Sequence, residues 1–193
     1  MTDCVGACNL YNDELPPSGT GTWRGELLGT RSSDTPPTLT WSLRFSWPHD
    51  GSLDVHVEGI PANVPSWREM AGVAAECTEV GEPISAWVYD GCHFEFEYAR
   101  IRILRQIGTW ARFSVVLAEC DWGFAVTLPS GETFETDQIH TTVDADFEGI
   151  SVPSAESGEL AEITDTAGFV RDAGAGFYRI VDPGTDQFPI VVD

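Results

Sequence analysis

Apolar side chains occupy every second position from Leu39 to Trp47, and polar side chains fill the positions between them. Alternation of this kind is typical of a β-strand with one buried and one solvated face. Turn-forming residues follow at 48–52, and the same alternation resumes from Leu53 to Val57. The pattern therefore predicts a β-hairpin with a large aromatic face, which the rest of the chain has to cover with a layer of similar size.

Further segments of strand character follow along the chain. Strands are predicted at 22–28, 84–89, 92–104, 110–118, 124–128 and 133–136, from 139 onward, and at 169–171, 177–181 and 188–192. Asp90-Gly91 is a strong hairpin signal, because both central residues of a type I′ turn need positive φ. Within 92–104 the apolar residues change from even to odd positions, which predicts a bulge or a sharp bend near Tyr98-Ala99.

One segment has a helical pattern instead. Residues 66–69 read Ser-Trp-Arg-Glu, which matches a capping box, and apolar residues continue at helical spacing from Met70 to Ala74. This predicts a short α-helix over about 66–77 that plugs one end or one face of the sheet. The expected fold class is mainly β: an antiparallel meander of hairpins that forms either a sandwich or a barrel.

The length of 193 residues suits a single domain. Residues 1–20 lack a sustained period and are expected to be a loose N-terminal leader, so that 21–193 form one β-rich domain. The first residues have no basic region, and no apolar run is long enough to span a bilayer, so the sequence predicts a cytoplasmic protein without a membrane partner. An odd number of cysteines, five, fits a reducing compartment.

The charge balance is extreme. The formal net charge is −21, from 31 acidic residues against ten basic ones, and every basic residue is Arg. Such a charge argues against direct binding to nucleic acid or to anionic lipid, because both are polyanions. Two explanations remain open: an acidic surface adapted to solubility in a salty cytoplasm, and a partner protein with a basic surface.

An acidic ladder lies on the strand predicted from 139 onward. Asp144, Asp146 and Glu148 share one phase of that strand, about 7 Å apart. The run resembles the start of a calcium-binding EF-hand loop, but the twelfth position is Ala155 instead of the bidentate Glu. We therefore expect a solvated strand face and no metal. No Arg or Lys occurs from Phe113 to Val170, so the ladder belongs to a long acidic stretch.

Other candidate chemistry is weaker. Cys4 and Cys8 have the spacing of one half of a zinc site, but the usual signature has two close pairs. Cys92 and His93 are adjacent, and adjacent residues of a strand point to opposite faces, so they form no dyad. The chain contains no recognised catalytic or nucleotide-binding motif. The sequence thus predicts no catalytic residue, no metal and no cofactor.

These observations favour a non-enzymatic, acidic protein-binding module that occupies a basic surface of a partner, as an inhibitor, an immunity protein or a nucleic-acid mimic does. One alternative is a β-barrel that holds a small apolar ligand, and another is an unrecognised metal-dependent or thiol enzyme. The residues expected to contact the partner are Asp137, Asp144, Asp146 and Glu148. The barrel alternative would use a lining of Trp41, Trp47, Phe94 and Phe96.

Overall fold

The computed structural model describes residues 19–28, 37–47, 53–62, 64–78, 83–89, 91–120, 122–127, 133–152, 160–172 and 177–180. The expectations for Cys4, Cys8, most of the N-terminal leader, the turn at 48–52 and the strand at 188–192 lie outside these residues. In chain order the elements are β1 (Gly19–Leu28), β2 (Thr38–Trp47), β3 (Leu53–Pro61), η1 (Trp67–Glu69), β4 (Ala74–Cys77), β5 (Ser85–Tyr89), β6 (His93–Ile107), β7 (Trp110–Cys120), β8 (Phe124–Thr127), β9 (Thr133–Thr136), β10 (Ile139–Ser151), α1 (Leu160–Ile163), β11 (Phe169–Asp172) and β12 (Phe177–Ile180).

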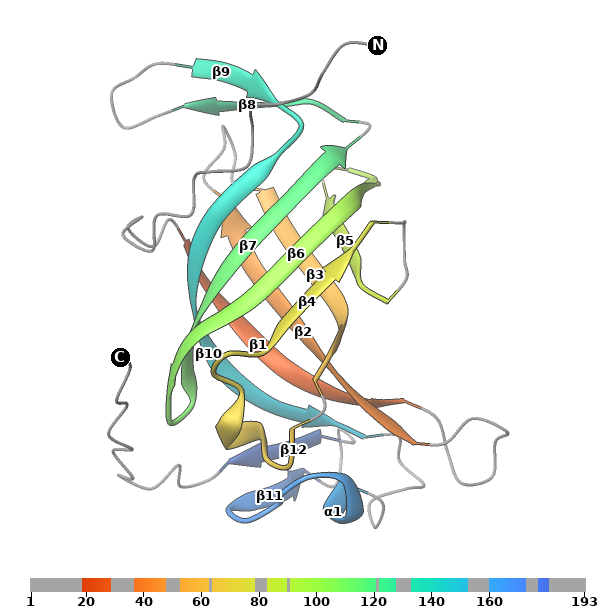
Figure 1. Ribbon diagram of the computed structural model, residues 1–193, viewed down its shortest axis with the longest axis vertical. Helices are drawn as coiled ribbons and strands as arrows, with labels where there is room; N and C mark the ends of the chain where they lie inside the picture. The colour runs from red at the N-terminus through yellow and green to blue at the C-terminus, as the bar shows by residue number, and fades with distance from the viewer. Residues whose placement is uncertain are drawn as a thin grey trace.

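Seven of the strands form a closed ring (Figure 1). Hydrogen-bonded neighbours follow the order β1, β2, β3, β5, β6, β7, β10, and each of these pairs is antiparallel. The ring closes where β10 pairs with β1 in parallel, from Gly19 opposite Val143 to Glu26 opposite Ser151. The predicted mainly β, antiparallel class is confirmed, and the closing pair makes the architecture a barrel, because a closed sheet covers its apolar face with itself.

Aromatic and aliphatic side chains fill the barrel. Trp23 is 1% exposed, and its ring centroid lies 5.5 Å from that of Trp41 and 6.2 Å from that of Phe113. Along β2, Trp41, Leu43 and Phe45 are buried, while Arg44 and Ser46 are exposed. The alternation of apolar and polar residues along β2 therefore predicts the inner face of the barrel wall correctly.

The segment after β3 closes the lower end of the barrel in Figure 1, as the sequence predicts. Trp67 is fully buried there, and its ring stacks on Phe147 with centroids 4.6 Å apart. The α-helix expected over 66–77 is wrong in type and length: a 3₁₀ turn covers Trp67–Glu69, and strand β4 follows at Ala74–Cys77. Gly72 has φ +87° and donates its amide to Ile103 O at 2.8 Å, which turns the chain into the sheet.

The predicted phase change in β6 exists, but it causes no register shift at Tyr98-Ala99. Phe96 and Ala99 are both buried, so two residues separate inward positions there instead of one. The β6–β7 pairing nevertheless keeps one register from Phe96 opposite Cys120 to Ile103 opposite Phe113. Strand β7 makes a matching change at Glu119, whose φ of +61° is left-handed. Each strand thus has one extra outward residue, and the two extra residues lie at paired positions. The register of the β6–β7 pairing is therefore preserved.

Short elements extend the barrel at both ends (Figure 1). Strands β8 and β9 form a separate hairpin at the upper end, and α1, β11 and β12 gather at the lower end. Strand β12 joins the wall by pairing Tyr178 with Ile150 and Phe177 with Ser151. None of the helices in the described part of the chain has the length and apolar character that crossing a membrane requires.

Candidate functional site

The acidic ladder lies on the outer face of β10. Val143 and Ala145 are buried in the barrel, whereas Asp146 and Glu148 are exposed and Asp144 is half-buried. Asp137 lies before the strand and is exposed. The structure thus puts three of the four predicted contact residues on one strand face, and Asp137 toward the upper end of the barrel.

Asp144 is neutralised within the barrel wall. Its two carboxylate oxygens accept hydrogen bonds from Arg112 on β7, Oδ1 from Nε at 2.7 Å and Oδ2 from Nη2 at 2.9 Å. These hydrogen bonds raise the pKa of the Arg112 guanidinium. Among the described residues, no group of three or more His, Cys, Asp or Glu side chains is arranged to hold a metal ion. Around Asp144 the surface of the acidic ladder therefore carries both positive and negative charge.

Glu148 occupies a bulge in the parallel β1–β10 pairing. Trp23 pairs with Phe147 and Arg24 pairs with Gly149, so Glu148 has no partner residue on β1. The extra residue turns the Glu148 side chain toward the outer face of β1 and β2, where it lines a hollow. The sequence pattern gave Glu148 the correct face, but the bulge depends on a strand more than 120 residues away and left no local signal.

The hollow has a volume of about 300 Å³ and lies outside the barrel wall, across β1, β2, β3 and β5. We call it the outer hollow. Thr22 and Ser42 line it with short side chains, which leave space between longer neighbours. Those neighbours are Arg24, Arg44, His56, Glu58, Trp87 and Glu148.

Two ion pairs hold the arginines of the outer hollow. Arg24 Nη2 lies 2.6 Å from Glu26 Oε1. Arg44 binds Asp54 through both Nε and Nη2, at 3.0 Å to Oδ1 and 2.5 Å to Oδ2. The hydrogen bonds from Arg44 lower the pKa of Asp54, and the same bonds raise the pKa of Arg44. Each arginine is thus engaged by a carboxylate that lies outside the centre of the hollow.

An aromatic stack forms one wall of the outer hollow. The imidazole of His56 lies against the indole of Trp87, with centroids 3.9 Å apart and an interplanar angle of 6°. His93 makes a T-shaped contact with the same indole, with centroids 4.5 Å apart. His56 Nε2 also lies 3.3 Å from Asp54 Oδ2, so the stack and the Arg44 ion pair are continuous.

A second acidic group gathers at the upper end of the barrel. Glu97 lies between Phe96 and Tyr98, which pair with Cys120 and Ala118, so it faces Glu119 across the β6–β7 ladder. Asp137 precedes Ile139 by two residues, and Ile139 pairs with Leu117, so Asp137 and Glu119 leave the same end of the β7–β10 ladder. We call the exposed acids of this end the acidic rim: Glu95, Glu97, Glu119, Glu135 and Asp137.

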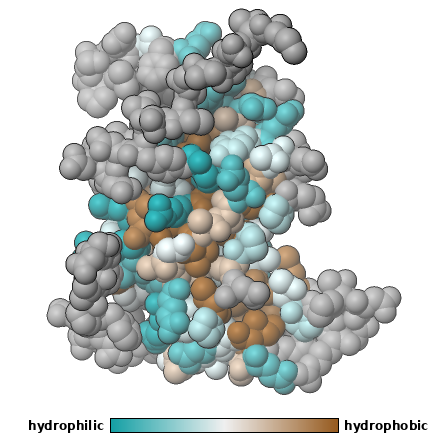
Figure 2. All heavy atoms as spheres, viewed as in Figure 1, coloured by the Kyte–Doolittle hydropathy of each residue, from teal (hydrophilic) through white to brown (hydrophobic). Residues whose placement is uncertain are grey.

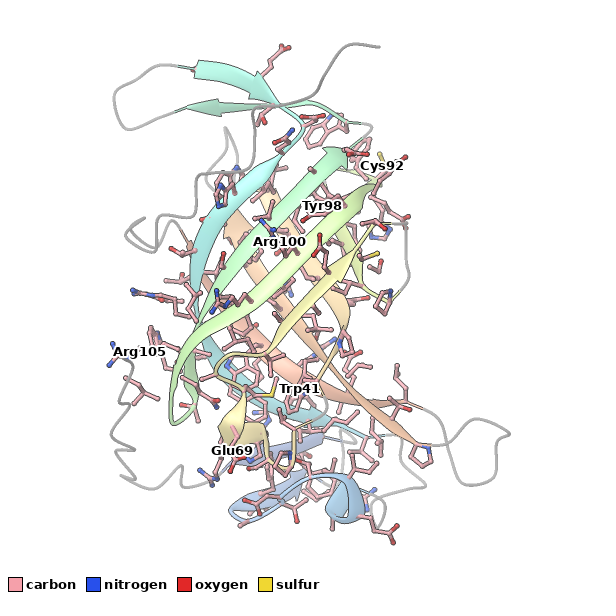
Figure 3. All side chains as sticks on the ribbon, viewed as in Figure 1. Trp41, Glu69, Cys92, Tyr98, Arg100 and Arg105 are labelled. Carbon is pink, nitrogen blue, oxygen red and sulfur yellow. The ribbon has the colours of Figure 1, made fainter. Side chains whose placement is uncertain are left out.

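The acidic rim carries uncompensated charge. Within the described part of the chain, none of its five carboxylates makes an ion pair. Figure 2 shows hydrophilic side chains on the upper part of the viewed face, and Figure 3 locates Cys92 at this end and Glu69 at the opposite end. Of this group, only Asp137 was predicted from the sequence as a contact residue, because the rim is assembled by strand pairing and not by sequence proximity.

Several of the thiols and rings on which the two alternative functions depend are packed in the barrel. Cys77 and Cys120 are buried and Cys92 is exposed, and none of the three forms a disulfide within the described residues. Of the rings proposed to line a ligand cavity, Trp41 and Phe96 are buried in the core, and Phe94 stacks on Trp122 with centroids 4.7 Å apart. No family model matches the chain, and neither the curated proteins nor the solved structures contain a significant match.

Proposed function

We propose that this protein is a non-enzymatic, acidic β-barrel that binds a basic surface of a partner protein, as an inhibitor, an immunity protein or a nucleic-acid mimic does. The observation that carries the proposal is the acidic rim. It brings exposed carboxylates from β6, β7, β9 and the residues just before β10 to one end of the molecule, and none of them is ion-paired within the described part of the chain. Like charges held together in this way create a field that attracts a cationic surface and raises its association rate.

The backbone at the centre of the rim supports the same proposal. Glu119 is the one residue other than glycine with positive φ in the described part of the chain. A non-glycine residue in this conformation costs about 1–3 kcal/mol, and such strain concentrates at functional sites. Here the strained backbone lets β7 carry two successive outward residues, Ala118 and Glu119, before Cys120 turns inward.

The β10 ladder contributes less to this surface than the rim. Arg112 neutralises Asp144, whereas Asp146 and Glu148 stay exposed. We therefore assign the main partner contact to Glu97, Glu119 and Asp137, with Asp146 and Glu148 extending it along the barrel. The proposed partner is a basic protein, and the proposed location is the cytoplasm.

A pull-down from the source organism at low and at moderate salt tests the proposal. The bait is the intact chain, and the test variant is Glu97→Gln/Glu119→Gln/Asp137→Asn. We expect the unchanged protein to capture a basic partner at low salt, less of it at moderate salt because exposed charges are screened, and the variant to lose it. Recovery of no basic protein at low salt contradicts the proposal.

A control variant separates the rim from net charge. Glu69→Gln/Glu162→Gln/Asp172→Asn removes three charges near the opposite end of the barrel, where Figure 3 places Glu69. We expect this variant to capture the partner as the unchanged protein does. Equal losses in both variants would mean that only total charge matters, and the rim would then be no specific contact surface.

A further inference from the structure

The outer hollow exists because its two arginines are drawn away from its centre. Glu26 holds Arg24 along β1, and Asp54 holds Arg44 across to β3. Thr22 and Ser42, which also line the hollow, have short side chains. A hollow of about 300 Å³ is at the small end of the range of ~300–1,000 Å³ for ligand pockets, so it suits one side chain better than a large cofactor.

Counted together with the two carboxylates that pair with its arginines, the outer hollow has a net negative charge. Two guanidinium groups, of Arg24 and Arg44, face the carboxylates of Glu26 and Asp54 in ion pairs. Two further carboxylates, of Glu58 and Glu148, line the hollow. Neither makes a hydrogen bond or an ion pair within the described residues, although Glu148 adds to the field that raises the pKa of Arg44. The unsatisfied groups of the hollow are therefore anionic acceptors.

The aromatic wall fits the same ligand. Trp87 is held in position by the stack with His56, which covers one face of the indole, and by a T-shaped contact with His93. The rings of Trp87 and His56 line the hollow and offer an apolar surface to the methylene stem of an arginine, and carboxylates with planar oxygen pairs match its guanidinium fork. Glu58 and Glu148 would thus contact the guanidinium, and the aromatic wall would contact the stem.

We propose that the outer hollow binds the side chain of an arginine residue on the partner protein. The inference rests on the proposed function, because a basic partner supplies the arginine. The guanidinium enters between Glu58 and Glu148, with its stem over Thr22 and Ser42. The hollow then adds a specific contact to the long-range attraction of the acidic rim.

Titration with N-acetylarginine amide tests the hollow without any partner. Calorimetry gives the affinity, and ¹H–¹⁵N spectra locate the site through the indole N–H of Trp87. N-acetylcitrulline amide, a neutral ligand of nearly the same shape, is the matched control ligand. We expect the arginine amide to shift the Trp87 signal and the citrulline amide to leave it unchanged. Equal binding of the two ligands would overturn the inference.

Charge-removing variants test which carboxylates bind. Glu58→Gln and Glu148→Gln each keep the side-chain size, and we expect each to weaken the arginine amide by about tenfold or more. Glu69→Gln is the control, because Glu69 is exposed and does not line the hollow. A similar loss in Glu69→Gln would reduce the effect to net charge and overturn the inference.

Titration with inorganic phosphate tests whether the hollow binds an anion instead of a cation. If inorganic phosphate binds instead, and Arg24→Gln or Arg44→Gln abolishes that binding, the hollow is an anion site and the inference is wrong. The two proposals fail separately. A partner captured through the acidic rim, with no binding of the arginine amide, refutes the hollow alone. Arginine amide binding without capture of any basic protein at low salt refutes the proposed function and leaves only a site for a free guanidinium.

Discussion

The side-chain amide of Gln106 on β6 anchors Met70, the residue that follows the η1 turn. Gln106 Oε1 accepts a hydrogen bond from Met70 N at 2.9 Å, and Gln106 Nε2 donates to Trp67 O at 3.0 Å. Nε2 also lies 3.2 Å from Gly108 O. Gln106 is 6% exposed, so one buried amide satisfies backbone groups of the segment that closes the barrel.

Replacing Gln106 with Leu should destabilise the protein by about 2–5 kcal/mol. The change leaves a buried amide N–H and buried carbonyl groups without partners, at about 1–3 kcal/mol for each unsatisfied group. Urea unfolding followed by tryptophan fluorescence measures the difference. Gln138→Leu is the control, since Gln138 is exposed, and it should change the free energy of unfolding by less than about 0.5 kcal/mol. Equal effects of the two changes would contradict the assigned role.

The same contact explains why the helix over 66–77 could not be predicted correctly. The local signals at Ser66 are real: Arg68 N donates to Ser66 Oγ at 3.2 Å, and Glu69 N donates to Ser66 O at 3.0 Å. They start a turn, but they do not decide how far it continues. Gln106 binds the Met70 amide, and β6 takes the backbone from Gly72 onward, so long-range pairing prevails over helix propensity.

Gly149 tests the junction between the barrel and its lower elements. Its φ is +133°, and a Cβ placed there would clash with the backbone oxygen of Tyr178 on β12. Gly149→Ala should therefore cost about 3 kcal/mol or more, because it combines backbone strain with a clash against backbone. Gly91→Ala is the control: φ is +75°, but a Cβ meets no atom within 4 Å.

Comparing Gly149→Ala with Gly91→Ala separates the cost of positive φ from the cost of the clash with Tyr178. We expect Gly91→Ala to lose only about 1–2 kcal/mol, the cost of a left-handed non-glycine residue. Thermal and urea unfolding of both variants measure the difference, and hydrogen exchange of the Tyr178 region shows whether β12 has left the wall. If Gly149→Ala cost no more than Gly91→Ala, the result would contradict the close approach of the Tyr178 backbone to Gly149.

The inner and outer faces of the barrel strands could be predicted from the sequence, but the acidic rim and the outer hollow could not. A period of two identifies inner and outer faces on β2, β3 and β10, because burial against the core imposes that period. It cannot show which outer side chains meet. Arg112 and Asp144 are 32 residues apart, and Glu97 faces Glu119 only through strand register. The acidic rim and the outer hollow both arise from such pairings.

Asp144 should bind no calcium tightly, because Arg112 occupies both of its carboxylate oxygens. A divalent cation would have to displace a guanidinium in bidentate contact. Calorimetric titration with calcium or manganese should give no site of micromolar affinity. A micromolar site that disappears in Asp144→Ala would contradict this, and titration of Arg112→Gln shows whether the arginine is what prevents binding.

Asp54 should make the stability of the barrel depend on pH in the acidic range. Hydrogen bonds from Arg44 lower its pKa below the ordinary value of 3.8. A carboxyl group whose pKa is lower in the folded state stabilises the fold at pH values above the unfolded pKa. That stabilisation is lost as the pH falls through the folded pKa, since protonated Asp54 no longer attracts Arg44.

Unfolding of the unchanged protein and of Asp54→Asn across pH measures this contribution. We expect Asp54→Asn to be less stable by about 0.2–1 kcal/mol at neutral pH, a small value because Arg44 is largely exposed. The difference should be constant above about pH 5 and should shrink below the unfolded pKa near 4. In an Arg44→Gln background the effect of Asp54→Asn should be smaller, because the principal partner is already absent. A difference independent of pH, or unchanged by Arg44→Gln, would mean that Asp54 contributes by packing and not by its charge.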